Sequence, residues 1–202
     1  MKHRGKIDII LGLICLMLAA LLVVDNQQED VEAGDEAQEM LVGVEAQIPE
    51  TAPVVVYEDE EEEDEGLSGE MRAVDVDGLS FICTVEIPAI EIKLPVQAEW
   101  SDAGAKISPC RYKGSVYEND LIIAAHNYQR HFGKIGQLVS GDEVIVTDVD
   151  GRHFHYNVIY QEIIDTFGVD EMDAGEWDLT LFTCTIGGKS RVTVRCAFDY
   201  QD

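Results

Sequence analysis

The sequence predicts a mainly β fold, a single closed or nearly closed barrel of about seven or eight strands with one or two short helices. Short apolar runs recur at near-regular spacing through residues 78–202, and turn residues such as Asp150 and Gly151 separate them. Only residues 130–138 show a clearly helical pattern. An apolar helix and an acidic, disordered linker are expected to precede this folded domain.

Two of the expected strands end on residues that carry chemistry. A buried-type strand ends on His126, and a later strand ends on Cys184. Gly187 and Gly188 then form a turn, and the next strand begins at Arg191, so the thiol and the guanidinium would face each other across a hairpin. The full set of expected strands comprises residues 79–85, 90–95, 120–126, 143–147, 152–160, 180–184 and 191–198.

The amino terminus has the pattern of a membrane anchor. Lys2, Arg4 and Lys6 precede an apolar run over residues 9–24, and acidic residues follow from position 25. We interpret residues 1–6 as a cytoplasmic tail and residues 7–24 as an uncleaved single-pass anchor, close to the lower length limit, with the bulk of the chain extracellular. A cleaved signal peptide is the alternative, but the run ends in Leu-Leu-Val-Val-Asp without an Ala-x-Ala site. The bulky Ile14 before Cys15 argues against lipidation.

The acidic charge of the chain is concentrated in one segment. The formal net charge is −26, and the stretch from Asp25 to Glu70 holds 18 acidic residues and no Lys or Arg. This balance excludes a nucleic-acid partner, which needs clustered cations. The unbroken acidic run at residues 58–65 repels itself, so residues 25–77 are expected to be a disordered spacer. Binding of calcium or of a basic partner is the alternative, although unordered carboxylates make a poor metal cage.

The cysteines show no metal-binding spacing. They fall at positions 15, 83, 110, 184 and 196 without a Cys-x-x-Cys pair, so no metal site and no cofactor are expected. Four lie outside the anchor, and the sequence selects no disulfide pairing among them. Alternation along the last strand places Cys196 on the apolar face and Arg191 and Arg195 on the other. Cys184 differs from the rest because it ends its strand.

A nucleophilic thiol needs a partner that holds or moves a proton. His126 ends an apolar strand and would project at a barrel rim, whereas His131 opens the short helix. His153 and His155 share one face of a strand, and His3 precedes the anchor. A lone histidine is usually a hydrogen-bonded structural residue, but the matching strand-end positions of His126 and Cys184 favour a shared site.

These motifs resemble those of the sortases, the membrane-anchored cysteine transpeptidases of Gram-positive bacteria. Thr180-Leu-Phe-Thr-Cys184 is similar to the TLxTC signature of that family. The resemblance covers the whole expected domain: it includes Ile87-Pro-Ala-Ile-Glu-Ile-Lys-Leu-Pro-Val96, Leu121-Ile-Ile-Ala-Ala-His126, Phe132-Gly-Lys-Ile-Gly-Gln-Leu138 and Gly141-Asp142. It implies a sortase-type β-barrel over residues 78–202, with His126, Cys184 and Arg191 as the catalytic residues.

The resemblance also implies a reaction. Cys184 would attack an LPxTG-like sorting signal of a secreted protein and form a thioacyl intermediate, which an amine of the cell wall would resolve. Arg195, two residues further along the same face, competes with Arg191 for the role of the arginine. Thr183 and Arg195 are further candidates for contact with the substrate. A secreted cysteine protease and a non-catalytic, membrane-tethered peptide-binding barrel are the alternative functions.

The subclass of sortase is less determined. No acidic or Asp-Pro lid motif of pilin-polymerising enzymes is present, and the connection between Tyr160 and Thr180 is short for class B. The sequence is therefore more like class A, D or E than class B or C. The expected partners are sorting-signal proteins, a cell-wall precursor or other amine acceptor, and the membrane itself.

Overall fold

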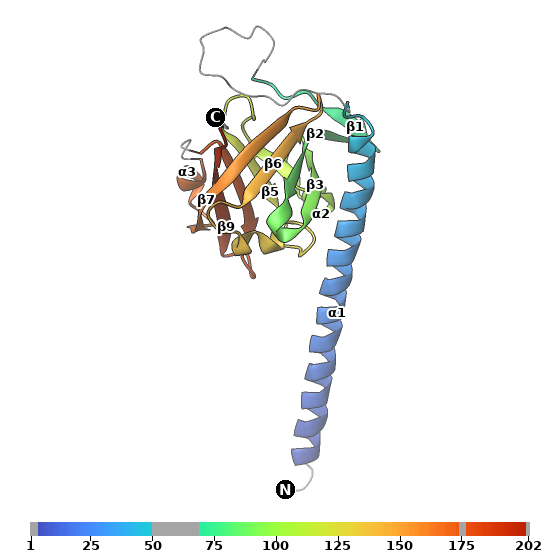
Figure 1. Cartoon of the computed structure of the whole chain (residues 1–202). Coiled ribbons are helices and arrows are strands. Elements are labelled where there is room, and N and C mark those ends of the chain that lie inside the picture. Colours follow the sequence, from blue (N-terminus) through green and yellow to red (C-terminus); the bar gives the residue numbers. More distant parts are fainter. Residues whose placement is uncertain (1–3, 50–68, 174–176, 201–202) are drawn as a thin grey trace, which may run out of the picture. The chain divides into compact units, whose positions relative to one another are not determined.

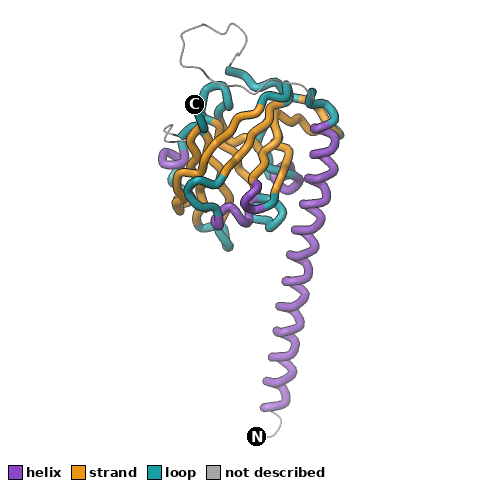
Figure 2. Tube along the Cα trace, viewed as in Figure 1, coloured by secondary structure: helices purple, strands orange, loops and turns teal. Residues whose placement is uncertain are grey.

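The computed structural model describes residues 4–49, 69–173 and 177–200 (Figure 1). The chain divides into two compact units, Met1–Glu32 and Ala33–Asp202. The second unit contains all the strands, and outside α1 its helical segments are short (Figure 2). In chain order the elements are α1 (Arg4–Glu45), β1 (Val74–Val76), β2 (Leu79–Ile87), η1 (Pro88–Ile90), β3 (Ile92–Gln97), α2 (Gly104–Ile107), β4 (Cys110–Lys113), β5 (Leu121–Ala125), η2 (Phe132–Gln137), β6 (Glu143–Asp148), β7 (His153–Asp165), α3 (Val169–Met172), β8 (Leu179–Cys184) and β9 (Ser190–Phe198).

The strands form one sheet that closes on itself. Its order is β1-β2-β3-β4-β5-β8-β9-β7-β6, and β6 pairs in turn with β2. The strands from β2 to β9 therefore make a closed eight-stranded barrel, with β1 added beside the first residues of β2. The neighbours pair antiparallel except for β3–β4 and β5–β8, which are parallel. The mainly β barrel predicted from the sequence is confirmed.

Alternation along the strands fills the barrel. Val144 and Val146 of β6 are fully buried, and so are Leu179 and Leu181 of β8, while the residues between them face the opposite side of the sheet. These side chains belong to one large apolar cluster that also takes in η2. Burial of apolar area of this kind is the main favourable term in folding.

Each expected strand is present, with shifts at the ends. The structure adds β1 and β4, which are three and four residues long, and extends β7 to Asp165. The expected helix at residues 130–138 is the six-residue 3-10 helix η2. The sequence analysis did not anticipate α3, which is a single turn in the connection between β7 and β8.

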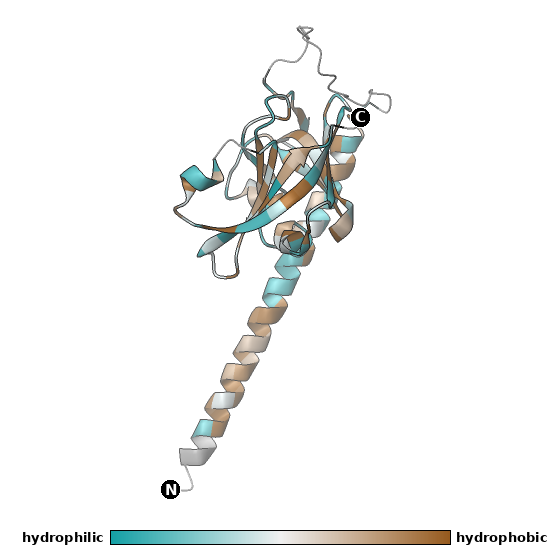
Figure 3. Cartoon of the chain, turned by 60° about the vertical axis from the view of Figure 1, so that its left-hand side comes forward, coloured by the Kyte–Doolittle hydropathy of each residue, from teal (hydrophilic) through white to brown (hydrophobic). Residues whose placement is uncertain are grey.

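The helix α1 includes the expected anchor and is 42 residues long. Its apolar residues from Ile9 to Val24 are exposed around the whole helix, and an 18-residue window reaches a mean hydropathy of 2.5 (Figure 3). A helix that is apolar on all sides suits a lipid environment. By length and composition, α1 is long and apolar enough to cross a membrane.

The sequence predicted a disordered linker from residue 25. In the structure, residues 25–45 are helical and continue α1. This stretch combines good helix formers with an apolar stripe, and Ala37 and Val44 are fully buried in the same unit as the barrel. The folded unit therefore begins at Ala33, not near residue 78. The acidic run at residues 58–65 lies outside the described residues.

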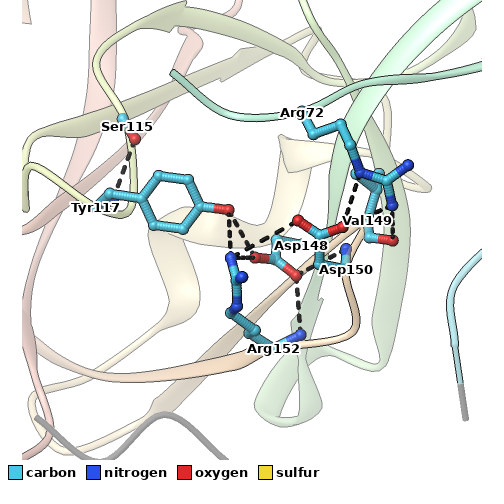
Figure 4. A network of polar contacts seen from close by, with 7 residues as sticks. All are labelled: Arg72, Ser115, Tyr117, Asp148, Val149, Asp150 and Arg152. Atoms are coloured by element: carbon cyan, nitrogen blue, oxygen red, sulfur yellow. Dashed lines mark hydrogen bonds and ion pairs between the residues drawn. The ribbon is translucent and has the colours of Figure 1, made fainter. Parts of the chain in front are cut away.

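A buried carboxylate organises one end of the barrel (Figure 4). Oδ1 of Asp148 accepts hydrogen bonds from the backbone N–H groups of Asp150 and Arg152, at 3.0 and 2.8 Å. Oδ2 accepts from the Tyr117 hydroxyl at 2.8 Å, and burial together with this bond raises the pKa of Tyr117. Arg72 donates to Asp150, which ties the chain before β1 to the turn between β6 and β7. This network lies at the end of the barrel where β5 begins.

We expect Asp148→Ala to lower the free energy of unfolding by about 3 kcal/mol, because it leaves Tyr117 and two backbone amides without their shared acceptor. Chemical denaturation followed by circular dichroism measures this change. The matched control, exposed Asp102→Ala, should stay within about 0.5 kcal/mol of the wild type. Equal stability of the two variants would show that the network does not support the barrel.

Candidate active site

Cys184 and Arg191 are direct neighbours across the β8–β9 hairpin. Cys184 is the last residue of β8, and the antiparallel register pairs it with Arg191. Gly187 and Gly188 in the turn both have positive φ, at 88° and 69°, which side chains rarely tolerate. Residues directly opposite in an antiparallel pair lie on the same face, so the thiol and the guanidinium share one side of the sheet.

The third residue comes from β5, which lies parallel to β8. Ala125 pairs with Thr183, so His126 and Cys184 are the next residues along two neighbouring strands. Strands in a sheet lie about 4.8 Å apart. His126, Cys184 and Arg191 thus form a row across β5, β8 and β9, with Cys184 exposed and the other two half-buried.

Thr183 points the other way, into the barrel. Its side chain is buried, and its hydroxyl donates to the carbonyl oxygen of Ala125 at 2.8 Å. This bond joins β8 to β5 at the residues immediately before Cys184 and His126. The sequence suggested that Thr183 contacts the substrate. The geometry instead favours a positioning role, in which Thr183 holds the ends of β5 and β8 together.

Arg191 is held from two sides. One guanidinium N–H donates to the backbone oxygen of Thr166 at 2.9 Å. The guanidinium carbon also lies 5.7 Å from the centre of the Phe182 ring, on the same face of β8 as Cys184. Arginine has five N–H donors, of which the bond to Thr166 uses one. This support fixes a permanent positive charge on the face of the sheet that carries Cys184.

Arg195 has a different environment from Arg191. Its side chain is 2% exposed, and its Nε donates to the Glu162 carboxylate at 2.7 Å. The other nitrogens donate to the Thr180 hydroxyl and to the backbone oxygens of Glu171 and Met172. Arg195 therefore holds the carboxyl-terminal end of α3 against β8. The geometry favours Arg191 over Arg195 as the arginine of the site.

The connection that contains α3 covers the outer face of the barrel beside this row. Met172 is buried there with Ile122, Ala124, Ile164 and Phe182 in a small apolar cluster. A hollow of about 20 Å³ lies next to Arg191, and a cavity of about 80 Å³ lies on the Arg195 side. The hollow is lined by Tyr112, Thr166, Gly168, Val169, Met172, Phe182 and Arg191.

The three buried cysteines of the barrel are poor nucleophiles at neutral pH. All five are free thiols, and Cys83, Cys110 and Cys196 are buried. Burial raises the pKa of Cys110 to about 11 and that of Cys196 to about 12, and it raises the pKa of Cys83 further. Cys184 is exposed at the end of its strand.

The remaining histidines of the barrel lie elsewhere. His153 contacts Thr147, and Nδ1 of His155 lies 2.9 Å from the Glu143 carboxylate, both on the β6–β7 hairpin. His131 is buried in the loop after β5. Within residues 4–49, 69–173 and 177–200, no three His, Cys, Asp or Glu side chains are grouped to hold a metal ion.

The sequence analysis missed the groups that hold the two arginines. Phe182 had a detectable signal, since it lies two residues before Cys184 and so on the same face of the strand. Thr166 and Glu162 had no such signal. Thr166 binds Arg191 through its backbone oxygen, and Glu162 pairs with an arginine far along the chain, so neither contact leaves a local sequence pattern.

The closed β-barrel thus carries a cysteine, a histidine and an arginine at three adjacent strand ends. A family model for the sortase domain matches residues 85–198, more than half of the chain. The protein therefore belongs to the sortase family. No curated protein matches the chain.

Solved sortase structures have the same fold. Sortase C from Clostridium perfringens SM101 is 25% identical with a TM-score of 0.53, and the match covers 64% of this chain and 72% of that one. The sortase D5 transpeptidase of Clostridium perfringens is 20% identical with a TM-score of 0.54, and the match covers 64% of this chain and 82% of that one. Sortase A from Corynebacterium diphtheriae is 19% identical with a TM-score of 0.53 over 61% of this chain; the match spans less than two thirds of that protein, 63%.

We expect a thiol alkylator at pH 7.5 to modify Cys184 before the three buried cysteines. A raised pKa lowers the thiolate fraction at a given pH, and a shift of two units leaves about 100-fold less thiolate. Peptide mapping by mass spectrometry measures the rate at each site. Labelling of Cys110 or Cys196 should rise with pH toward 11 or on unfolding. Early labelling of either at neutral pH would contradict the burial described here.

Substitution of Arg195 and of Arg191 should affect the free energy of unfolding to different extents. We expect Arg195→Met to lower the free energy of unfolding by about 3 kcal/mol, because Glu162 and the buried acceptors lose their partner. Arg191→Met removes the hydrogen bond to the Thr166 backbone oxygen at a half-buried position and should cost about 1 kcal/mol. Denaturant unfolding of both variants gives the comparison. The reverse order would overturn the assignment of structural and active-site roles.

Proposed function

We propose that this sortase is a transpeptidase acting on an LPxTG-like sorting signal, with Cys184, His126 and Arg191 as its catalytic residues. The observation that carries the proposal is their row at the ends of β5, β8 and β9. Cys184 pairs with Arg191, and Cys184 and His126 each follow the last β5–β8 pair, Ala125 with Thr183. A nucleophile flanked by a proton carrier and a permanent cation is the set that acyl transfer needs.

In the first half of the reaction, the Cys184 thiolate attacks the carbonyl carbon of the threonine in the signal. A carbon–sulfur bond forms and the carbon–nitrogen bond of the peptide breaks. His126, as an imidazolium, gives its proton to the departing amine. The product on the protein is a thioacyl intermediate.

In the second half, an amine attacks the thioacyl carbon and gives a proton to the now neutral His126. The carbon–sulfur bond breaks, the Cys184 thiolate is restored, and a new amide joins the substrate to the acceptor. Arg191 cannot lose its proton, so it serves as a donor to the oxyanion or to the substrate backbone.

Exposed apolar side chains flank the row and suit an extended peptide with apolar residues. Phe167 and Val169, in the connection after β7, are 91% and 54% exposed. Ile186, in the β8–β9 turn, is 98% exposed. The hollow beside Arg191 lies between this connection and β8. These features support binding of the sorting signal along the outer face of the barrel.

We propose a single-pass topology with the amino terminus in the cytoplasm and the barrel outside. Lys2, Arg4 and Lys6 before the apolar run and the acidic residues after it support this orientation. The partners would be secreted proteins that carry a sorting signal and an amine of the cell wall or its precursor, and both are present on that side of the membrane.

A transfer assay on the full-length protein in detergent tests the function. A library of LPxTG-like peptides is mixed with the protein, with and without an amine acceptor, and the products are identified by mass spectrometry. We expect an amide product whose formation requires the amine. Cys184→Ala should abolish it, and Arg191→Ala should lower the rate about 100- to 1000-fold, the usual effect of losing one oxyanion donor.

The exposed Lys189→Ala is the matched control in the same hairpin and should keep the wild-type rate. Cleavage without transfer would indicate a cysteine protease. Absence of a thioacyl adduct on Cys184 would indicate a peptide-binding barrel. Normal transfer by Cys184→Ala would refute the assignment of the nucleophile.

A further inference from the structure

The last turns of α1 are part of the folded unit that carries the active site. Ala33, Ala37, Met40 and Val44 recur at helical spacing and are buried. Ala37 belongs to the main apolar cluster of the barrel, and Met40 and Val44 pack in a second cluster with Phe81 of β2. This end of the helix is therefore fixed on the barrel by burial of an apolar stripe.

The same part of α1 contacts the loop that follows His126. Nε2 of His131 lies 3.2 Å from the backbone oxygen of Ala33, so Nε2 carries the proton and donates. His131 is fully buried at this contact. Arg130 forms an ion pair with Asp35, with 2.6 Å between the guanidinium nitrogen and the carboxylate oxygen. A side chain at Gly34 would collide with Arg130, so the helix and the loop approach closely.

A series of ring contacts continues from His131 to the active site. The Tyr128 ring meets the His131 ring edge-on, with centroids 5.4 Å apart. Tyr128 also packs against His126, with centroids 5.3 Å apart and the rings tilted by 44°. Aromatic pairs at these separations are attractive and directional.

Backbone hydrogen bonds keep this loop tight. The oxygen of Tyr128 accepts from the backbone N–H groups of His131 and Gly133, at 3.0 and 2.8 Å. The oxygen of His126 accepts from Phe132 at 3.3 Å. Tyr128 therefore has a fixed place between His131 and His126, and the contacts from Ala33 to His126 are continuous.

We propose that Tyr128 and His131 are positioning residues, through which the barrel-bound end of α1 orients the imidazole of His126. The inference rests on the proposed role of His126 in proton transfer. His126 follows the end of its strand, so the strand alone does not fix its ring. The end of α1 would then contribute to catalysis by orienting His126, in addition to linking the anchor to the barrel.

The test uses the full-length protein and compares four variants. Tyr128→Leu removes the ring, Tyr128→Phe retains it, and His131→Leu breaks the contact with Ala33. Tyr200→Leu is the matched control, an exposed ring that packs on Phe198 near the carboxyl end of β9. We expect Tyr128→Leu and His131→Leu to lower kcat for peptide transfer by about 10- to 100-fold, as misplacement of a reacting group does.

The KM for the peptide should stay within about twofold, because the substrate site itself is unchanged. Tyr128→Phe should retain the wild-type kcat, and so should the Tyr200→Leu control. Wild-type kcat in both Tyr128→Leu and His131→Leu would overturn the inference. If His131→Leu fails to fold, Tyr128→Leu and Tyr128→Phe decide the outcome.

A second measurement does not depend on activity. In the histidine-labelled protein, the imidazole NMR signal of His126, assigned by its loss in His126→Gln, should shift or broaden in His131→Leu and stay unchanged in Tyr200→Leu. An unchanged His126 signal in His131→Leu would refute the coupling. If the wild type transfers no peptide while this signal responds, the proposed function fails and the positioning of His126 stands.

Discussion

The candidate site depends on the parallel register between β5 and β8. Pairing of Ala125 with Thr183 brings His126 level with Cys184. The Thr183 hydroxyl also donates a hydrogen bond to the Ala125 carbonyl oxygen, which strengthens this pairing. A shift of one residue would turn every side chain of β8 to the other face and direct Cys184 into the barrel. The antiparallel pairing with β9 then adds Arg191 to the same row. Three chain segments thus make one site because the sheet allows one register.

Support for this row comes from outside the strands. The connection between β7 and β8 lies on the outer face, where Arg195 binds the end of α3 and Arg191 binds Thr166. Met172 seals the connection onto the apolar cluster. On the other side of the row, the loop after His126 packs against the end of α1. Rigid strands hold the reacting groups, and loops shape their surroundings, which is the usual division in enzymes.

Sequence reasoning identified the barrel because alternation and turn residues are local signals that survive in each strand. It missed β1 and β4, whose three and four residues hold at most two full alternations. It also read residues 25–45 as disordered, because the acidic composition hid a sparse apolar stripe that includes Ala37 and Val44. That stripe stabilises a helix only when a barrel surface is present to cover it.

The sequence by itself determined the positions of the main strands, the apolar segment at residues 9–24, and the placement of His126, Cys184 and Arg191 at the ends of their strands. Each follows from periodicity over a few neighbouring residues. Only the tertiary structure decided which strands are neighbours, and so which thiol, imidazole and guanidinium lie at adjacent strand ends. It also separated Arg191 from Arg195, which alternation places on the same face. The physical reason is that burial and ion pairing with Glu162 arise from contacts between residues far apart in the chain.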